Sequence, residues 1–164
     1  GVAGVNWLSR ILPVRVLGKC GGYTSDIVDG MRWAAGLAVT GVSANPSPAR
    51  VINLSLGGAH SCSTTEQSAI DAITAAGTAV VAAAGNSNTN VSGFSPASCN
   101  NVISVAAINQ LGKRAYYSNY GSLVKIAAPG GDYTVDSMIL STLNSGTTLP
   151  PGNVNPASFM KGRL

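Results

Sequence analysis

The stretch from Val80 to Asn88 constrains the fold more than any other part of this sequence. It opens with five apolar, uncharged residues, Val80 to Ala84, a run that is too short to cross a membrane and is typical of a strand buried in a parallel sheet. Gly85 and Asn86 follow directly, and ligands of open α/β sheets bind at the carboxyl ends of strands. The Asn86 side-chain NH2 could therefore stabilise a developing oxyanion. The alternative is that Asn86 only caps the segment that follows it.

Strand-like and helix-like segments alternate along the chain. Apolar residues with period two, or in short continuous runs, indicate strands, and apolar residues at helical spacing indicate helices. The order strand, helix, strand, helix, strand predicts right-handed βαβ crossovers. We therefore expect a three-layer α/β fold, with a mainly parallel sheet and helices on both faces, in which Val80 to Ala83 form a central strand buried on both faces. Strands are expected at 9–17, 50–55, 78–83, 102–107, 123–128 and 137–142, and helices between a cap at Thr24 or Ser25 and a stop at Gly41, and between a cap at Ser63 or Thr64 and a stop at Gly77.

Composition limits the functions that this chain can have. Of 164 residues, 45% are hydrophobic and only 10% are charged, which favours one globular domain or less over a disordered segment. The net charge is +4, but the basic residues are scattered, so we expect no nucleic-acid partner. No apolar run approaches the ~18 residues of a membrane span, and the start has no signal-peptide pattern. Because the chain begins at Gly1 in the style of a domain interior, we treat both of its ends as cut edges.

Three cysteines lie in loop-like segments rich in small polar residues. Cys20, Cys62 and Cys99 show no CxxC spacing, which disfavours a zinc or redox site. Loop cysteines of this kind indicate disulfides and an oxidising compartment. Buried free thiols in a cytosolic protein are the alternative. The odd number leaves one thiol free or paired outside this sequence.

Two motifs together resemble the subtilases, the subtilisin-like serine proteases. Val51 to Gly58 is similar to the substrate-binding strand of that family, and Val81 to Asn86 is similar to its oxyanion-hole segment. The resemblance covers nearly all 164 residues, so the chain is expected to be a partial subtilase peptidase domain over residues 1–164. Weaker matches support it at 1–4, 12–17, 95–97, 102–107, 117–121 and 127–130.

The resemblance implies roles for several residues. Asn86 would be the oxyanion-hole donor, and an extended peptide or protein substrate would add as a strand between two walls of the S1 pocket. The walls would be formed by Ser55, Leu56 and Gly57 on one side and by Ala83, Ala84 and Gly85 on the other.

The resemblance also bears on disulfides, location and metals. It implies a Cys62–Cys99 disulfide, with the partner of Cys20 elsewhere, and secretion by a bacterium. It leaves calcium binding open, although Asp132 and Asp136 supply too few ligands for an oxygen cage, and we therefore assign no metal.

The catalytic triad of the family is not found in these residues. The only histidine, His60, lacks the family's motif and is interpreted as a surface residue, and Leu164 stands where the nucleophile is expected. Ser55 and Ser87 have no recognisable base beside them. We therefore expect this chain alone to be catalytically inactive and, with apolar surface exposed, only marginally stable.

Two other hypotheses compete with the protease fragment. One is a non-catalytic pseudoprotease or peptide-binding module, which binds another polypeptide or is completed by one, including the missing segments of its own domain. The other is a nucleotide-binding domain, which is the weakest because the sequence has neither the GxGxxG nor the GxxxxGK[ST] phosphate loop.

Overall fold

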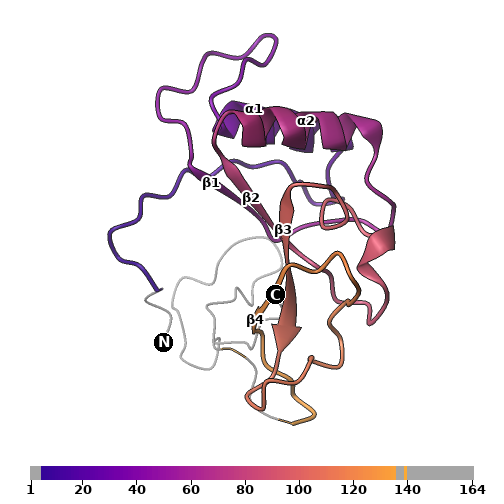
Figure 1. Ribbon diagram of the computed structural model, residues 1–164. Helices are drawn as coiled ribbons and strands as arrows, with labels where there is room; N and C mark the ends of the chain where they lie inside the picture. The colour runs from indigo at the N-terminus through magenta and orange to yellow at the C-terminus, as the bar shows by residue number, and fades with distance from the viewer. Residues whose placement is uncertain (1–4, 136–138, 140–164) are drawn as a thin grey trace.

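The computed structural model describes residues 5–135 and 139, and within them a parallel four-stranded sheet forms the framework (Figure 1). The strands stand in the order β1-β2-β3-β4, and each neighbouring pair is parallel, with Leu54 opposite Ala82, Val80 opposite Val102 and Val105 opposite Ile126. The elements are α1 (Thr24–Ala34), β1 (Val51–Leu54), α2 (Thr64–Ala75), β2 (Ala79–Ala83), the 3-10 helix η1 (Val91–Gly93), β3 (Val102–Ile108) and β4 (Ile126–Pro129).

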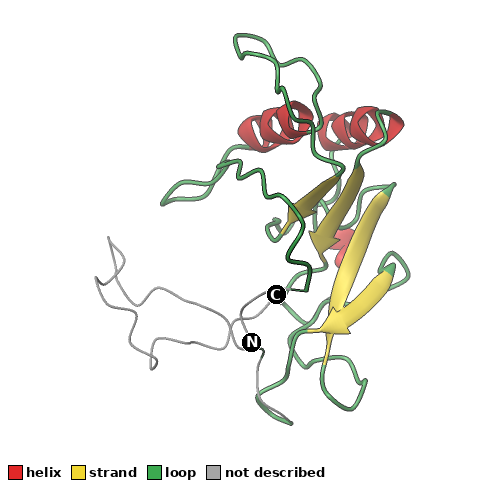
Figure 2. Cartoon of the chain, turned by 90° about the vertical axis from the view of Figure 1, so that its left-hand side faces the viewer, coloured by secondary structure: helices red, strands yellow, loops and turns green. Residues whose placement is uncertain are grey.

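One face of this sheet is covered by both helices (Figure 2). Alternate strand residues point to this face because side chains alternate along a strand. Ile52, Val80 and Val102 are buried here, and Ile70 and Ile73 of α2 are fully buried against them. This shared core explains why the pattern of the sequence reproduces β1, α2, β2 and β3 almost to their ends.

The opposite face of the sheet carries apolar side chains that the described residues leave partly uncovered. Val51, Ile103 and Ile126 are 58%, 41% and 57% exposed. Val81 and Ala83 of β2 are half-buried, whereas Val80 and Ala82 are fully buried. β2 is thus an interior strand, but the prediction that it is buried on both faces is wrong for this face, because the two described helices both pack on the other one.

Local signals fix the ends of α2 as expected. Ser63 is the N-cap and forms a capping box with Glu66. At the other end Gly77 has a φ of +87°, and Thr78 N–H donates to the Ile73 carbonyl at 3.2 Å. This is the Schellman arrangement that a glycine just beyond a helix allows.

The ends of α1 differ from the prediction. Its N-cap is Tyr23, which makes no side-chain capping hydrogen bond, so neither Thr24 nor Ser25 is the cap. The helix also ends before Gly36 rather than at Gly41, because Gly36 adopts a φ of +80° and Leu37 N–H donates back to the Arg32 carbonyl at 2.9 Å. The apolar residues beyond Gly36 kept the helical spacing without continuing the helix.

The predicted strand at 9–17 is not formed. Residues 9–17 pair with no strand of the described sheet and are mostly exposed. Val16 instead packs over Gly30 of α1, where its Cγ1 occupies the space that a Cβ on Gly30 would need, and Val14 contacts the helix-covered core. The segment is apolar and extended as the pattern indicates, but a strand also needs a neighbour with which to pair.

The remaining predictions concern the later strands. β4 begins at Ile126, three residues later than expected, and runs to Pro129 at the edge of the sheet, where a residue without an N–H is tolerated. The strand expected at 137–142 falls, apart from residue 139, outside the described residues.

No helix in the described part of the chain has the length and apolar character needed to span a membrane.

Candidate functional site

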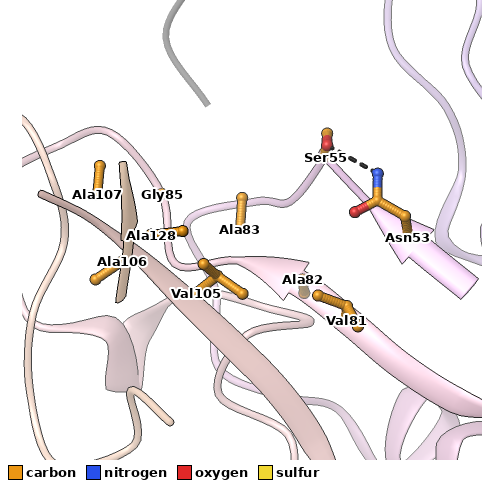
Figure 3. A pocket seen from close by; sticks show the side chains of 10 residues that line it. All are labelled: Asn53, Ser55, Val81, Ala82, Ala83, Gly85, Val105, Ala106, Ala107 and Ala128. Carbon is orange, nitrogen blue, oxygen red and sulfur yellow. Dashed lines mark hydrogen bonds between the residues drawn. The ribbon is translucent and has the colours of Figure 1, made fainter. Parts of the chain in front are cut away.

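Two segments leave the carboxyl ends of β1 and β2 side by side. Leu54 and Ala82 are the last paired residues of these strands, so residues 55–57 and 83–85 continue from neighbouring positions. A cavity of about 210 Å³ opens beside them, lined mainly by residues of the face that the helices leave open (Figure 3). Its lining is formed by Asn53, Ser55, Val81, Ala82, Ala83, Gly85, Val105, Ala106, Ala107 and Ala128.

The expected wall residues differ in how they meet this opening. Ser55, Ala83 and Gly85 line the cavity. Leu56 packs against the helix-covered core, and Ala84 is 1% exposed within it, so neither side chain lines the cavity. The Ala84 N–H also donates to the Val105 carbonyl at 2.9 Å. Gly57 is exposed.

Asn86 follows the second segment and is exposed. Its side-chain amide has no hydrogen-bond partner among the described residues. Gly85 turns the backbone there with a φ of +107°, a conformation that glycine adopts without steric cost. The Asn86 amide is therefore an exposed donor at the carboxyl end of an interior strand, unpaired by any residue that the structure describes.

The segment that carries Asn86 is attached to the chain around Asn119. Asn119 is fully buried, and its Nδ2 donates to the Ala84 carbonyl at 2.9 Å. Its Oδ1 accepts from Ser87 N–H at 2.9 Å and from Thr89 N–H at 3.2 Å. A neutral side chain from a distant loop thus fixes the backbone on both sides of Asn86.

The first segment is attached to a different part of the chain. Gly58 and Ser95 exchange backbone hydrogen bonds, at 2.9 Å from Gly58 N–H and 3.1 Å from Ser95 N–H. Gly57 packs so tightly that a Cβ built on it would lie 2.7 Å from the Ser95 carbonyl oxygen. The next peptide bond, Ser95–Pro96, is cis. The 94–96 segment also reaches the second wall, because Phe94 Cδ1 lies 3.4 Å from a Cβ built on Gly85.

A buried carboxylate links the Ser95 segment to α2. Glu66 Oε1 accepts from Ser95 Oγ at 2.6 Å, and Glu66 Oε2 accepts from Ser63 Oγ at 2.7 Å and Ser63 N–H at 2.9 Å. Burial alone would raise the pKa of the Glu66 carboxyl, but the hydrogen bonds from Ser95 and Ser63 outweigh burial and lower that pKa below its usual value. Glu66 is therefore charged at neutral pH, and it accepts the hydrogen bond that holds the Ser95 hydroxyl.

Cys62 and Cys99, the pair implied by the family resemblance, form a disulfide with a Cα–Cα distance of 5.1 Å. It joins the loop after Gly58 to the loop after Pro96. Cys20 is a free, exposed cysteine. The disulfide and Glu66 thus fasten the same two loops, one covalently and one by hydrogen bonds.

The described residues show no serine with a base beside it at the site. His60 lies in the exposed loop after Gly58, and its Nδ1 is 3.9 Å from Glu66 Oε2. Ser55 Oγ accepts a hydrogen bond from Asn53 Nδ2 at 3.1 Å (Figure 3), and Ser87 N–H is held by Asn119. These neighbours give neither serine an acceptor for its proton that could act as a general base.

The two carboxylates considered for calcium are Asp132 and Asp136. Asp132 accepts hydrogen bonds from Thr134 N–H at 3.0 Å, Thr134 Oγ1 at 2.5 Å and Tyr116 N–H at 3.1 Å. Its Oδ1 thus closes a turn with Thr134, and its Oδ2 ties this turn to the distant Tyr116. Asp136 lies outside the described residues, and the described part of the chain has no cluster of three or more side chains among His, Cys, Asp and Glu that could hold a metal.

Sequence reasoning missed Asn119 and Glu66 as residues that organise the site. Asn119 belongs to a polar aromatic stretch that gives only a modest family match, and the pattern around Glu66 indicates only a first-turn residue. The low share of charged residues, 10%, makes the Glu66 carboxyl notable but gives no signal for the neutral Asn119 amide. It also does not say which distant groups the Glu66 carboxyl will bind.

Comparison with known proteins agrees on one family. The profile described as "Subtilase family", of peptidase S8 type, matches residues 1–156. An "Extracellular protease" of Xanthomonas campestris pv. campestris is 55% identical over 159 residues, which are 97% of this chain and 26% of that protein. An "Extracellular basic protease" of Dichelobacter nodosus is 52% identical over 150 residues, 92% of this chain and 24% of that protein. This chain spans about a quarter of the length of these curated relatives.

Solved structures agree with this family. A protease from Pseudoalteromonas arctica superposes with a TM-score of 0.86 at 53% identity, covering 92% of this chain and 45% of that one. A cold-adapted subtilisin-like serine proteinase superposes with a TM-score of 0.60 at 36% identity, covering 77% of this chain and 41% of that one. The expected subtilisin-like α/β fold is thus confirmed.

Proposed function

Because this chain belongs to the subtilase family, we propose that it forms the central, substrate-binding part of a serine endopeptidase that hydrolyses peptide bonds. The substrate is an extended stretch of peptide or protein. Two relatives that are more than half identical to this chain are named extracellular proteases, and a disulfide joins two of its loops, so we place the enzyme outside the cell.

The substrate lies between the two segments that leave β1 and β2. Ser55, Leu56 and Gly57 form one wall and Ala83, Ala84 and Gly85 form the other. Ser55 and Gly57 are exposed residues beyond the last β1–β2 pair, where an extended peptide can add by main-chain hydrogen bonds. Small side chains keep the space between the walls open.

Asn86 stabilises the transition state. As a nucleophile attacks the scissile carbonyl, negative charge grows on the carbonyl oxygen, and the Asn86 NH2 donates a hydrogen bond to it. We assign neither the nucleophile nor its base to Ser55, Ser87 or His60. The complete triad comes from parts of the protease beyond these 164 residues.

The exposed and uncommitted amide of Asn86 supports this proposal more than any other observation. A side chain whose only task was to cap the next segment would have its oxygen on a backbone N–H. Here Asn119 Oδ1 fills that role for Ser87 and Thr89. Asn86 is left with its donor free and its backbone fixed, as electrostatic stabilisation requires.

The test is Asn86→Leu in the full-length protease that carries this chain. We expect kcat to fall about 10²–10³-fold while KM changes little, because the amide acts mainly in the transition state. This magnitude is the one known for a subtilisin, a member of the same family, and is carried over rather than calculated from this structure. Asn100→Leu, at an exposed asparagine of a neighbouring loop, is the control and should leave kcat within about twofold. An Asn86→Leu enzyme with an unchanged kcat would rule out the role of Asn86.

A further inference from the structure

The segment after β2 has no regular structure of its own at Asn86. Residues 84–89 leave the sheet in a bend, and Asn86, Ser87 and Asn88 are exposed. An exposed bend does not hold a side chain in one place, yet a donor for an oxyanion must be held within about 0.5 Å of its productive position. Something outside the segment therefore has to fix it.

Residue 119 makes four hydrogen bonds to this segment, two before Asn86 and two after it. Its N–H donates to the Gly85 carbonyl at 2.9 Å and its Nδ2 to the Ala84 carbonyl at 2.9 Å. On the other side its Oδ1 accepts from the N–H groups of Ser87 and Thr89. The backbone of Asn86 is thus bracketed by one buried residue.

The Asn119 side chain must be an amide in one orientation. Its oxygen faces two N–H donors and its nitrogen faces a carbonyl acceptor, so the reverse orientation would leave all three groups unsatisfied. A carboxylate of the same shape would keep the two N–H contacts but would place an acceptor against the Ala84 carbonyl. Aspartate at this position therefore changes one contact without removing bulk.

Packing against Gly85 makes the fit tight. A Cβ built on Gly85 would overlap Asn119 Nδ2, so the amide rests against the bare backbone of the residue next to Asn86. A shift of Asn119 therefore shifts the turn from which Asn86 projects.

The outer half of the segment is held without the Asn119 side chain. Asn88 N–H donates to the Tyr117 carbonyl at 2.8 Å, and Tyr120 N–H donates to the Thr89 carbonyl at 3.0 Å. Arg114 Nη1 donates to Asn88 Oδ1 at 2.8 Å. Loss of the Asn119 amide is thus expected to displace the residues around Asn86 and leave the rest of the loop attached.

We propose that Asn119 is a positioning residue for catalysis, which sets the place of the Asn86 donor through the backbone on both sides of it. This proposal rests on the proposed role of Asn86. Asn119 does not touch the substrate and acts only through residues 84–89.

The test is a double-mutant cycle between Asn119→Asp and Asn86→Leu in the full-length protease, with active sites titrated so that only folded enzyme is counted. With Asn86 present, Asn119→Asp should lower kcat about 10- to 100-fold, as misplacement of a catalytic group by about 1 Å does, and change KM less than about threefold. In the Asn86→Leu background it should change kcat less than about twofold, since there is no donor left to misplace. Asn119→Ala, measured in the same cycle, replaces the aspartate variant if that variant yields no titratable enzyme.

The matched control is Asn45→Asp. Asn45 is also a buried amide that uses both ends, because its Nδ2 donates to the Trp33 and Ala34 carbonyls at 3.1 Å and its Oδ1 accepts from Ser47 N–H at 2.9 Å. It lies before β1, at the other end of the sheet, and should leave kcat of the titrated enzyme unchanged in both backgrounds. An equal loss from Asn119→Asp in both backgrounds, or no loss in either, would overturn the positioning role. An unchanged kcat for Asn86→Leu alone would instead show that the proposed function of Asn86 is wrong.

Discussion

The wall at 55–57, which leads to Gly58, and the wall at 83–85, which leads to Asn86, are held by different chemistry. The first is attached to Ser95, which Glu66 holds through a charged carboxylate, and the disulfide fastens the two loops that follow. The second is attached to Asn119, a neutral amide that makes three side-chain hydrogen bonds. Both walls depend on contacts across about thirty residues of sequence.

Because they are held by different groups, the two walls should respond to different changes in conditions. A carboxylate and a disulfide depend on pH and on redox conditions, so the position of the first wall should change with both. An amide has no charge to lose, so the second wall should respond only to changes of shape. The second wall carries Asn86, and the donor is thereby kept apart from the groups that titrate or are reduced.

The largest expected effect comes from removing the disulfide with Cys62→Ala and Cys99→Ala together. A cross-link over 37 residues stabilises by about 3–4 kcal/mol through the entropy of the unfolded chain. We expect a loss of that size in the unfolding free energy of the inhibited full-length protease, measured by urea denaturation. Because the disulfide fastens the loops that hold the first wall, whereas the hydrogen bonds of Asn119 fix the second, KM should rise more than kcat falls.

Ser61→Ala is the control for the disulfide variant, at an exposed position next to Cys62. It should change the unfolding free energy by less than about 0.5 kcal/mol. A disulfide variant whose kcat falls while KM stays constant would show that the two walls are not independent.

The second prediction compares two glycines with positive φ. A Cβ on Gly85 (φ +107°) would overlap Asn119 Nδ2, whereas a Cβ on Gly77 (φ +87°) would meet nothing within 4 Å. Gly85→Ala should therefore destabilise by about 2–4 kcal/mol, from backbone strain plus overpacking, and Gly77→Ala by about 1 kcal/mol, from strain alone. Urea unfolding of the inhibited protease measures both losses. Equal losses would mean that the Asn119 side chain moves aside for a Cβ on Gly85 at no cost.

The kcat of the two glycine variants should differ as their stability does. Gly85→Ala acts on the wall that carries Asn86, so kcat of the titrated enzyme should fall with it. Gly77 lies just before β2, at the opposite end of that strand from this wall, so Gly77→Ala should leave kcat within about twofold.

The parts of the fold that the sequence predicted are those with local causes. Ser63 and Glu66 form a capping box three residues apart, and Gly77 ends the same helix. The apolar runs of β1, β2 and β3 are strands because each has a neighbour and a helix-covered face. Residues 9–17 had the same apolar character, but the described residues give them no pairing partner, and Val16 packs on Gly30 instead.

The site was predicted in its chemistry but not in its supports. Asn86 and the wall residues stand in short motifs, and these could be matched to a family. Asn119 reaches Ser87 over 32 residues and Glu66 reaches Ser95 over 29. Such contacts follow from how the loops pack at the carboxyl end of the sheet, and no periodicity within either segment encodes them.

The smallest expected effect, and the one that separates the two walls most cleanly, comes from Glu66→Gln. The folded protein lowers the pKa of Glu66, so this carboxylate contributes stability above its unfolded pKa of about 4.5, and that contribution is lost as pH falls through the lowered folded value. We expect Glu66→Gln to lower the unfolding free energy by about 1–2 kcal/mol at neutral pH, as for the loss of hydrogen bonds to a charged group.

The gap in unfolding free energy between wild type and Glu66→Gln should close as pH falls below about 4.5, and urea unfolding of the inhibited protease from pH 7 to pH 3 measures it. Asp29→Asn, at an exposed carboxyl of α1, provides a control in which a carboxyl is lost without the loss of a bond to Ser95. Since the hydrogen bonds of Glu66 hold the segment to which the first wall is bonded, whereas Asn119 fixes the second, Glu66→Gln should raise KM at neutral pH and leave kcat nearly unchanged, the reverse of Asn119→Asp. A gap that stays constant down to pH 3 would mean that the Glu66 charge does not hold Ser95, and the contrast between a titrating wall and a neutral one would be lost.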